Sequence, residues 1–177
     1  MVRKLISIDM AYAGRMAKQA GLPNFPICRF RDLVNRDDTV DVIETFVTII
    51  KHVPRDDTPE EIATVATNVQ RAKDFFESNG CRAIICPAKR TQDGGFKQSD
   101  DQRLMITTLS TCLRLRPDFL VFVGADGDYA PMLWELRSEG IRTEVVAVRT
   151  TLASDLQRAS YSVVDLEGIF ATIREAS

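Results

Sequence analysis

The sequence predicts an α/β fold built on a mostly parallel sheet. Short apolar segments, typical of strands buried on both faces, alternate along the chain with segments whose apolar residues recur at helical spacing. Turn-forming residues separate the two kinds of segment, as in repeated strand–helix–strand units. The 177 residues, of which 45% are hydrophobic, are enough for one well-buried core, so we expect a single domain over residues 1–177.

The first third of the chain predicts two strands and a helix. Residues 5–8 are expected as a strand and residues 12–20 as a short helix. Residues 44–53 are rich in β-branched residues, which pack well on a sheet, and are expected as a second strand. Residues 23–38, between this helix and the second strand, are expected to be irregular.

A long amphipathic helix is expected next. Thr58 precedes Pro59 and two glutamates, which is the usual beginning of a helix: an N-cap hydroxyl, a proline at the first position and acids in the first turn. The helical spacing continues to about Asn79, and Gly80 ends it. Residues 81–86 are then expected as a buried strand that the following proline ends.

The second half of the chain has the clearest alternation of strands and helices. A polar loop at residues 89–99 contains two glycines and is a candidate for mobility. The elements expected after it are, in order, a helix at 100–115, a strand at 119–123, a helix at 129–139, a strand at 144–148, a helical turn at 152–158, a short strand at 161–164 and a terminal helix.

Composition limits the chemistry. A net charge of −2 argues against a protein that grips nucleic acid through bulk electrostatics, so any nucleic acid would be held locally. The single histidine, His52, excludes a mechanism with two imidazoles as acid and base. Carboxylates or a metal would therefore have to carry any reaction.

The cysteines and the apolar segments indicate a cytoplasmic protein. No CxxC pair is present, and we interpret the cysteines as buried free thiols rather than as a zinc site; they are Cys28, Cys81, Cys86 and Cys112. The start of the chain lacks the long apolar region of a signal peptide. No stretch approaches the roughly 20 apolar residues of a membrane span.

Aspartates follow the predicted strands at the positions where ligands bind. In an open parallel sheet, ligands occupy the crevice beyond the carboxyl ends of the strands. Asp9 ends the first strand, Asp126 follows the strand at 119–123, and Asp128 stands where the chain turns into the next helix. Gly124 and Gly127 allow the tight turn.

A further carboxylate comes from the start of the helix after the polar loop, at Asp100 or Asp101. Carboxylates held close together repel one another, and a hard cation such as Mg²⁺ or Mn²⁺ relieves that repulsion. Such a metal activates water and stabilises charge on a phosphodiester. The sequence therefore predicts a divalent-cation site without histidine.

Each aspartate also has a plainer interpretation. Asp100 and Asp128 are well placed as helix N-caps, and Asp9 as a hydrogen-bonding residue at a strand end. Asp126 has no evident cap to make, which makes it the strongest single candidate. Independent caps would have no reason to gather at one edge of the sheet, and this favours the metal site.

These residues resemble a known family. The segment VFVGADGDYAPMLWEL, residues 121–136, resembles the SGDxDF region of NYN domains of the LabA-like group, a branch of the PIN-like nuclease superfamily. The opening ISID is similar to the segment that carries the family's first metal-binding aspartate, and KQSDD, residues 97–101, to its Lys-x-x-Asp segment. GIRTEVVAV with residues 152–161 is similar to its closing strand, helix and strand.

The resemblance implies a three-layer α/β/α Rossmann-like PIN/NYN fold with a metal-dependent, RNA-cleaving site. The positions that match the family's carboxylates are Asp9, Asp126 and Asp128. Asp100 or Asp101 matches the fourth: aligning Lys97 with the family lysine favours Asp100, whereas the helix phase favours Asp101.

The chain departs from the family pattern at three positions. Tyr12 stands where many members have asparagine, Thr107 where they have a further aspartate, and Ser160 where they often have aspartate. These departures imply a slow nuclease, one with narrowed substrate choice, or a module that binds without cutting.

Basic and aromatic residues are expected to border the crevice and to bind substrate. Cations there position phosphates, although solvated loop charges are the alternative; they are Lys89, Arg90, Lys97 and Arg103. Tyr12 and Tyr129 are candidate substrate contacts, and Phe96 or Tyr129 could stack a base, unless the ring is part of the core.

Three functions compete. The favoured one is a metal-dependent endoribonuclease acting on single-stranded RNA with Mg²⁺ or Mn²⁺, as a homo-oligomer or within a larger multidomain protein. The alternative is a catalytically degenerate module for RNA or nucleotide binding. A receiver domain or an aspartyl phosphatase fits less well, because Ala11 replaces the phosphatase's second aspartate and residues 144–148 lack a lysine.

Overall fold

The computed structural model describes residues 1–53, 58–90, 96–97 and 100–175. A seven-stranded sheet of order β4-β3-β2-β1-β5-β6-β7 forms its centre. Six strands run parallel, and the short edge strand β4 runs antiparallel to β3. The strands are β1 Val2–Ile8, β2 Val40–Val53, β3 Arg82–Arg90, β4 Phe96–Lys97, β5 Phe119–Val123, β6 Arg142–Ala147 and β7 Ser162–Asp165.

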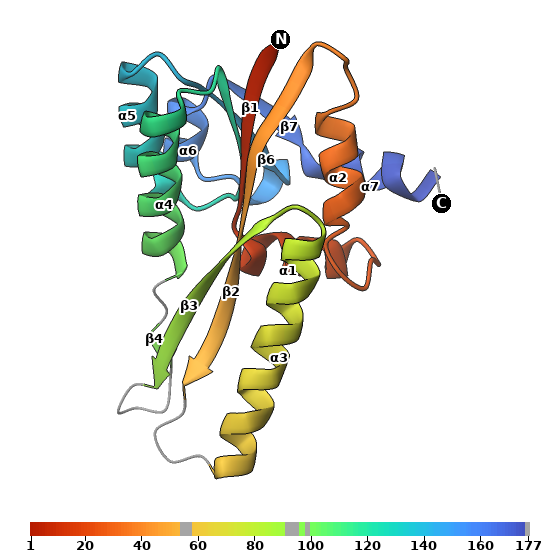
Figure 1. The fold of residues 1–177 in the computed structure, drawn as a ribbon. Helices are drawn as coiled ribbons and strands as arrows, with labels where there is room; N and C mark the ends of the chain where they lie inside the picture. Colours follow the sequence, from red (N-terminus) through yellow and green to blue (C-terminus); the bar gives the residue numbers. More distant parts are fainter. Residues whose placement is uncertain (54–57, 91–95, 98–99, 176–177) are drawn as a thin grey trace.

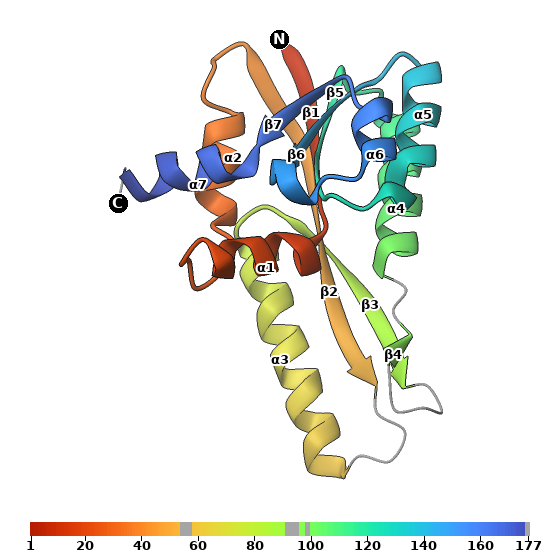
Figure 2. The same cartoon turned by 180° about the vertical axis from the view of Figure 1, so that it is seen from behind.

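Helices cover both faces of the sheet. One layer contains α4, α5 and α6, and the other contains α1, α2, α3 and α7 (Figures 1 and 2). The helices are α1 Met10–Gln19, α2 Ile27–Val34, α3 Pro59–Ser78, α4 Asp100–Leu115, α5 Ala130–Ser138, α6 Ser154–Ala159 and α7 Leu166–Glu175, with 3₁₀ turns η1 Gly127–Tyr129 and η2 Arg149–Thr151. The predicted three-layer α/β/α architecture is confirmed.

The strand order places a crevice between β1 and β5. β1 pairs with β2 on one side and with β5 on the other, so the chain fills the sheet outward in both directions from β1. The crevice beyond the carboxyl ends at such a reversal is where α/β sheets bind ligands. Asp9 and the turn after β5 lie at this edge.

The central strands are buried on both faces because helices pack against each side. Leu5, Ile6, Leu120 and Val145 are fully buried in one hydrophobic cluster that joins both helical layers. In contrast, α3 has no buried residue, and it extends with the ends of β2 and β3 away from the rest of the chain (Figure 1). The hydrophobic core therefore holds the carboxyl ends of β1 and β5 more firmly than it holds α3.

The long helix begins as predicted. Thr58 Oγ1 accepts a hydrogen bond from the Glu61 N–H, and the Glu61 carboxylate accepts one from the Thr58 N–H. This reciprocal capping box satisfies two backbone donors that the first turn leaves unpaired. The local sequence was sufficient here because both partners lie within one turn.

Two predictions about the first half were wrong. Residues 23–38 contain the helix α2, which buries Ile27 and Phe30 but has no side-chain cap at Pro26. Ile27, Phe30 and Val34 do recur at helical spacing, but the segment is only eight residues long and begins without a local cap, and this signal was overlooked. β3 continues past Pro87 to Arg90, and proline is tolerated there because β4 pairs only with the last two residues of β3.

The cysteines are free thiols. Cys81, Cys86 and Cys112 are buried, as predicted, whereas Cys28 is exposed. Burial raises the pKa of Cys86 to about 11 and that of Cys112 to about 12, so both stay protonated at neutral pH. Among the described helices, none has the length and apolar content needed to cross a bilayer.

Candidate functional site

Asp9 joins the end of β1 to the start of α1. Its backbone N–H donates to the carbonyl of Val123, the last residue of β5, at 2.9 Å. Its Oδ1 accepts from the Tyr12 N–H at 3.0 Å, so Asp9 is the N-cap of α1. The predicted strand-end hydrogen-bonding role is therefore real, and Asp9 also lines the pocket beyond the ends of the strands.

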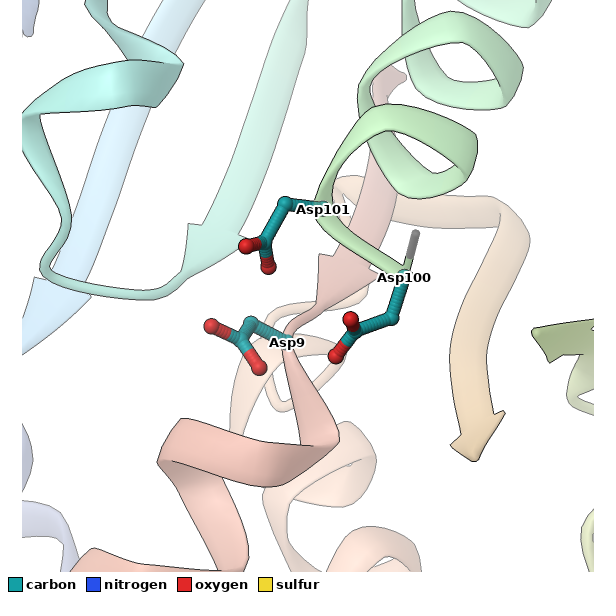
Figure 3. Close-up of side chains that lie close together, drawn as sticks. All are labelled: Asp9, Asp100 and Asp101. Carbon is teal, nitrogen blue, oxygen red and sulfur yellow. The ribbon is translucent and has the colours of Figure 1, made fainter. Parts of the chain in front are cut away.

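Asp100 and Asp101 come from the first turn of α4. That helix is docked on the sheet by a buried hydrogen bond of 2.7 Å between Ser7 Oγ and Thr108 Oγ1. Asp9, Asp100 and Asp101 each present an oxygen within 4.8 Å of the others, and Figure 3 shows the three carboxylates turned toward one another. The sequence left Asp100 and Asp101 as alternatives, and both belong to the cluster.

Burial and mutual repulsion make the cluster electrostatically costly. Burial, followed by repulsion from Asp101 and Asp100, raises the pKa of Asp9 to about 6, although the Tyr12 N–H opposes the shift. The pKa of Asp100 is also raised, mainly by burial. Asp100 is 3% exposed, and its buried Oδ1 has no hydrogen-bond partner among the described residues.

Asp126 lines the same pocket, of about 480 Å³, as the three clustered aspartates. Its Oδ1 accepts from the Asp128 N–H at 3.0 Å and caps η1, so the prediction that Asp126 has no cap to make was wrong. Asp128 is exposed and is not among the pocket residues. A Cβ at Gly124 would lie 2.7 Å from the Phe122 ring, which explains the glycine before this turn.

The donor set fits a hard divalent cation. It contains only carboxylate oxygens, which Mg²⁺ and Mn²⁺ prefer. The pKa values of Asp9 and Asp100 are raised, because burial and repulsion between the carboxylates disfavour the charged forms. A cation among Asp9, Asp100 and Asp101 would offset that repulsion and supply a partner for the unpaired Asp100 oxygen.

Comparison with known proteins assigns the chain to a family. The family model of the NYN domain matches residues 23–167. The chain belongs to the NYN domain family. NYN domains are part of the PIN-like nuclease superfamily, whose members are typically nucleases that use divalent metals. The match begins after β1, so it contains Asp100, Asp101 and Asp126 but not Asp9.

A solved structure shares the fold of this NYN chain. It is the crystal structure of a protein of unknown function from Vibrio parahaemolyticus, with a TM-score of 0.71 and 15% sequence identity. The alignment covers 96% of this chain and 95% of the other. No curated protein sequence matches the NYN chain significantly.

The two tyrosines predicted to contact substrate are buried. The Tyr129 hydroxyl donates to Asp101 Oδ1 at 2.7 Å, and the ring packs 4.6 Å from that of Phe122. Tyr12 lines the pocket, but its hydroxyl accepts from the Val148 N–H at 2.9 Å and lies 2.8 Å from Thr151 Oγ1. Neither ring is free to stack on a base, which corrects the expectation for Tyr129 in favour of the core.

The predicted cationic rim is only partly described. The side chains of Lys89, Arg90 and Lys97 lie outside the described residues, as does that of Phe96, and residues 91–95 and 98–99 leave the predicted mobility of the loop untested. Arg103 is exposed and donates to the Ile85 carbonyl at 3.3 Å; it does not line the pocket.

Sequence reasoning missed Arg15, an exposed residue of α1 that lines the acidic pocket with its guanidinium 6.0 Å from the Tyr12 ring. Its position three residues after Tyr12 places both on one face of α1, and this spacing was the available signal. An arginine side chain therefore lines the acidic pocket together with the aspartates.

Proposed function

We propose that this NYN domain is a metal-dependent endoribonuclease that hydrolyses single-stranded RNA with Mg²⁺ or Mn²⁺. The observation that carries the proposal is the convergence of Asp9, Asp100 and Asp101 within 4.8 Å at the crevice between β1 and β5. Membership of a superfamily of nucleases supports the same reaction class. The LabA-like resemblance of the 121–136 segment supports RNA as the substrate.

Each residue has a role in this proposal. Asp9, Asp100 and Asp101 hold the cation, and Tyr129 positions Asp101 by donating to its Oδ1. Asp126, in the same pocket, positions the attacking water. Asp128 supports Asp126, because its backbone N–H donates to Asp126 Oδ1. Arg15 binds a non-bridging phosphate oxygen.

A bound divalent cation supplies Lewis-acid activation of water and neutralises charge that develops on the phosphodiester. The protein residues orient the reacting groups. Because Asp9 and Asp100 are buried, their carboxylates have few alternative positions, so the site is largely preorganised. This organisation requires no histidine.

The test is cleavage of varied single-stranded RNAs by purified protein of measured metal content. We expect cleavage with Mg²⁺ or Mn²⁺, none in EDTA, and loss of cleavage in Asp126→Asn. Asp32→Asn changes an exposed acid on α2 and serves as the matched control. Intact RNA after incubation with metal-loaded protein would refute the proposal.

The environment of Tyr12 favours a second candidate, a degenerate RNA-binding module. Tyr12 occupies the position of a family asparagine, and its hydroxyl is engaged by Val148 and Thr151 rather than directed to the acids. Thr107, where the family has an aspartate, does not line the pocket. Tight RNA binding that survives Asp126→Asn, without cleavage, would support this candidate.

A further inference from the structure

An arginine lies over two aromatic rings at the amino ends of β5, β6 and β7, the edge of the sheet opposite the acids. The Arg142 guanidinium lies 5.5 Å from the ring centroid of Phe119 and 5.3 Å from that of Tyr161. The two rings meet edge to face at 6.0 Å. Lys4 Nζ lies 5.4 Å from the Phe119 ring.

A second pair on α5 extends this surface. The Arg137 guanidinium lies 5.3 Å from the Trp134 ring. Arg137, Arg142 and Tyr161 line one pocket of about 220 Å³. Trp134 is 48% exposed and Tyr161 is 64% exposed, so both rings are open to a ligand. We define the arginine–aromatic surface as Phe119, Trp134, Arg137, Arg142 and Tyr161.

The arginines of this surface lack acidic partners. Nearby Lys4 and Arg116 are paired with Glu144 and Glu139, whereas within the described residues no carboxylate lies within 4.0 Å of Arg137 or Arg142. A cation in the last turn offsets the dipole of α5, which accounts for Arg137. It does not account for Arg142, which is the first residue of a strand.

A buried hydroxyl in the same pocket is also unpaired. Thr143 lines the pocket, is 2% exposed, and its Oγ1 has no hydrogen-bond partner in the described part of the chain. A buried hydroxyl without a partner is costly unless another group bonds it. It is a second indication, independent of charge, that the pocket accepts a polar ligand.

The second pocket lies one short helix away from the acidic pocket. Ala153, the N-cap of α6, lines the acidic pocket, and Ala159, the last residue of α6, lines the second. Six residues at a rise of about 1.5 Å each separate them by about 9 Å along the helix. A 12-nucleotide single strand that runs along α6 is long enough to contact both pockets, whereas a trinucleotide held in the acidic pocket is too short to fill both.

We propose that the arginine–aromatic surface is an exosite for single-stranded RNA that holds the strand while the acidic pocket acts on it. Tyr161 and Trp134 stack on bases, and Arg137 and Arg142 contact phosphates. Because the chain has a net charge of −2, it cannot attract RNA through its overall charge, and binding requires a local cationic surface such as this one. The choice of RNA rests on the proposed function.

Binding in EDTA tests the exosite without cleavage. The probe is a fluorescently labelled 12-nucleotide oligouridine, measured by anisotropy against the full chain. Trp134→Ala/Arg137→Ala and Tyr161→Ala are each expected to weaken binding roughly tenfold. Loss of the Arg137 phosphate contact should also reduce the magnitude of the slope of log affinity against log salt by about 0.7.

The matched control is Arg71→Ala/Phe75→Ala, which removes an exposed arginine and an exposed aromatic ring from α3 in the other helical layer. Thermal melts establish that each variant is folded. An affinity for the oligouridine within twofold of wild type in the folded exosite variants, or an equal loss in the control, overturns the exosite.

The outcome separates the exosite from the nuclease proposal. An exosite variant should lose more cleavage rate on a 12-nucleotide RNA than on a trinucleotide, whereas Asp126→Asn should bind the long RNA and cleave neither. RNA binding that depends on Tyr161 without any cleavage would refute only the nuclease. Cleavage that is insensitive to Trp134, Arg137 and Tyr161 at every RNA length would refute only the exosite.

Discussion

The pockets at the two ends of α6 differ in charge and in how their side chains are held. The acidic pocket contains two buried carboxylates, fixed by the end of β1 and the start of α4. The second pocket contains Arg137, which lies over the exposed ring of Trp134 on α5, and Arg142, which lies over the exposed ring of Tyr161 just before β7. Buried, fixed acids suit the ordered geometry of a reaction, and exposed cations with rings suit adaptable binding.

The largest expected effect is on catalysis at the acidic end. Asp9→Asn keeps the α1 cap, because asparagine caps as well as aspartate, but removes one charged ligand. Loss of a residue that only hydrogen-bonds a metal ligand lowers metal affinity or activity about 10- to 100-fold. Loss of a ligand itself should have a larger effect, so the cleavage rate should fall by at least ~100-fold. The measurement is the single-turnover rate on a trinucleotide with Mn²⁺. Arg137→Ala should leave that rate unchanged, and a comparable loss would contradict the division between the two ends.

Next in size is a pH effect on the metal-free protein. The folded pKa of Asp9 is about 6, above the ordinary value of 3.8, so its contribution to stability is fully present below about pH 4 and is lost as pH rises through 6. Two pKa units correspond to about 3 kcal/mol. In EDTA, the free energy of unfolding of Asp9→Asn should therefore exceed that of wild type by up to ~3 kcal/mol at pH 7. The two values should be equal at about pH 4.

Urea unfolding of both proteins between pH 4 and 7 measures this difference. Added Mg²⁺ should stabilise wild type at pH 7 far more than Asp9→Asn, since a ligand that binds only the folded state stabilises it. A stability difference that does not vary with pH would show that Asp9 carries no electrostatic strain.

A smaller effect is expected where α4 is docked on the sheet. Ser7→Ala leaves the buried Thr108 hydroxyl without its partner at 2.7 Å and should destabilise the fold by about 1–3 kcal/mol. Metal affinity should fall as well, because Asp100 and Asp101 begin α4. The double variant Ser7→Ala/Thr108→Val removes both polar groups and should recover most of the stability. Unchanged metal affinity in Ser7→Ala would show that the docking does not position the acids.

The smallest effect is expected from an ion pair at the amino end. Lys4 Nζ lies 2.8 Å from Glu144 Oε2, and both side chains are partly exposed. A double-mutant cycle with Lys4→Met and Glu144→Gln should give a coupling below about 1 kcal/mol, decreasing with salt. A coupling of several kcal/mol would mean that the amino end is held as rigidly as the acidic end.

The sequence predictions succeeded where the stabilising contacts lie close together in the sequence and failed where they lie far apart. The capping box at Thr58 and Glu61 and the buried strand at 119–123 were predicted because their causes lie within a few residues. The extension of β3 through Pro87 depends on which neighbour lies beside it in the sheet, and α2 is stabilised by packing of Phe30 rather than by a local cap. These were missed because the deciding contacts are distant in sequence.

By itself, the sequence determined the α/β alternation, the acids that follow the strands and the exclusion of a mechanism with two imidazoles, because periodicity and residue chemistry are local properties. Only the tertiary structure decided that Asp100 and Asp101 both join Asp9, that Tyr129 is hydrogen-bonded to Asp101, and that Arg142 lies over the rings of Phe119 and Tyr161. The physical reason is that strand order and helix docking set the distances between residues up to about a hundred positions apart, and no local pattern encodes those distances.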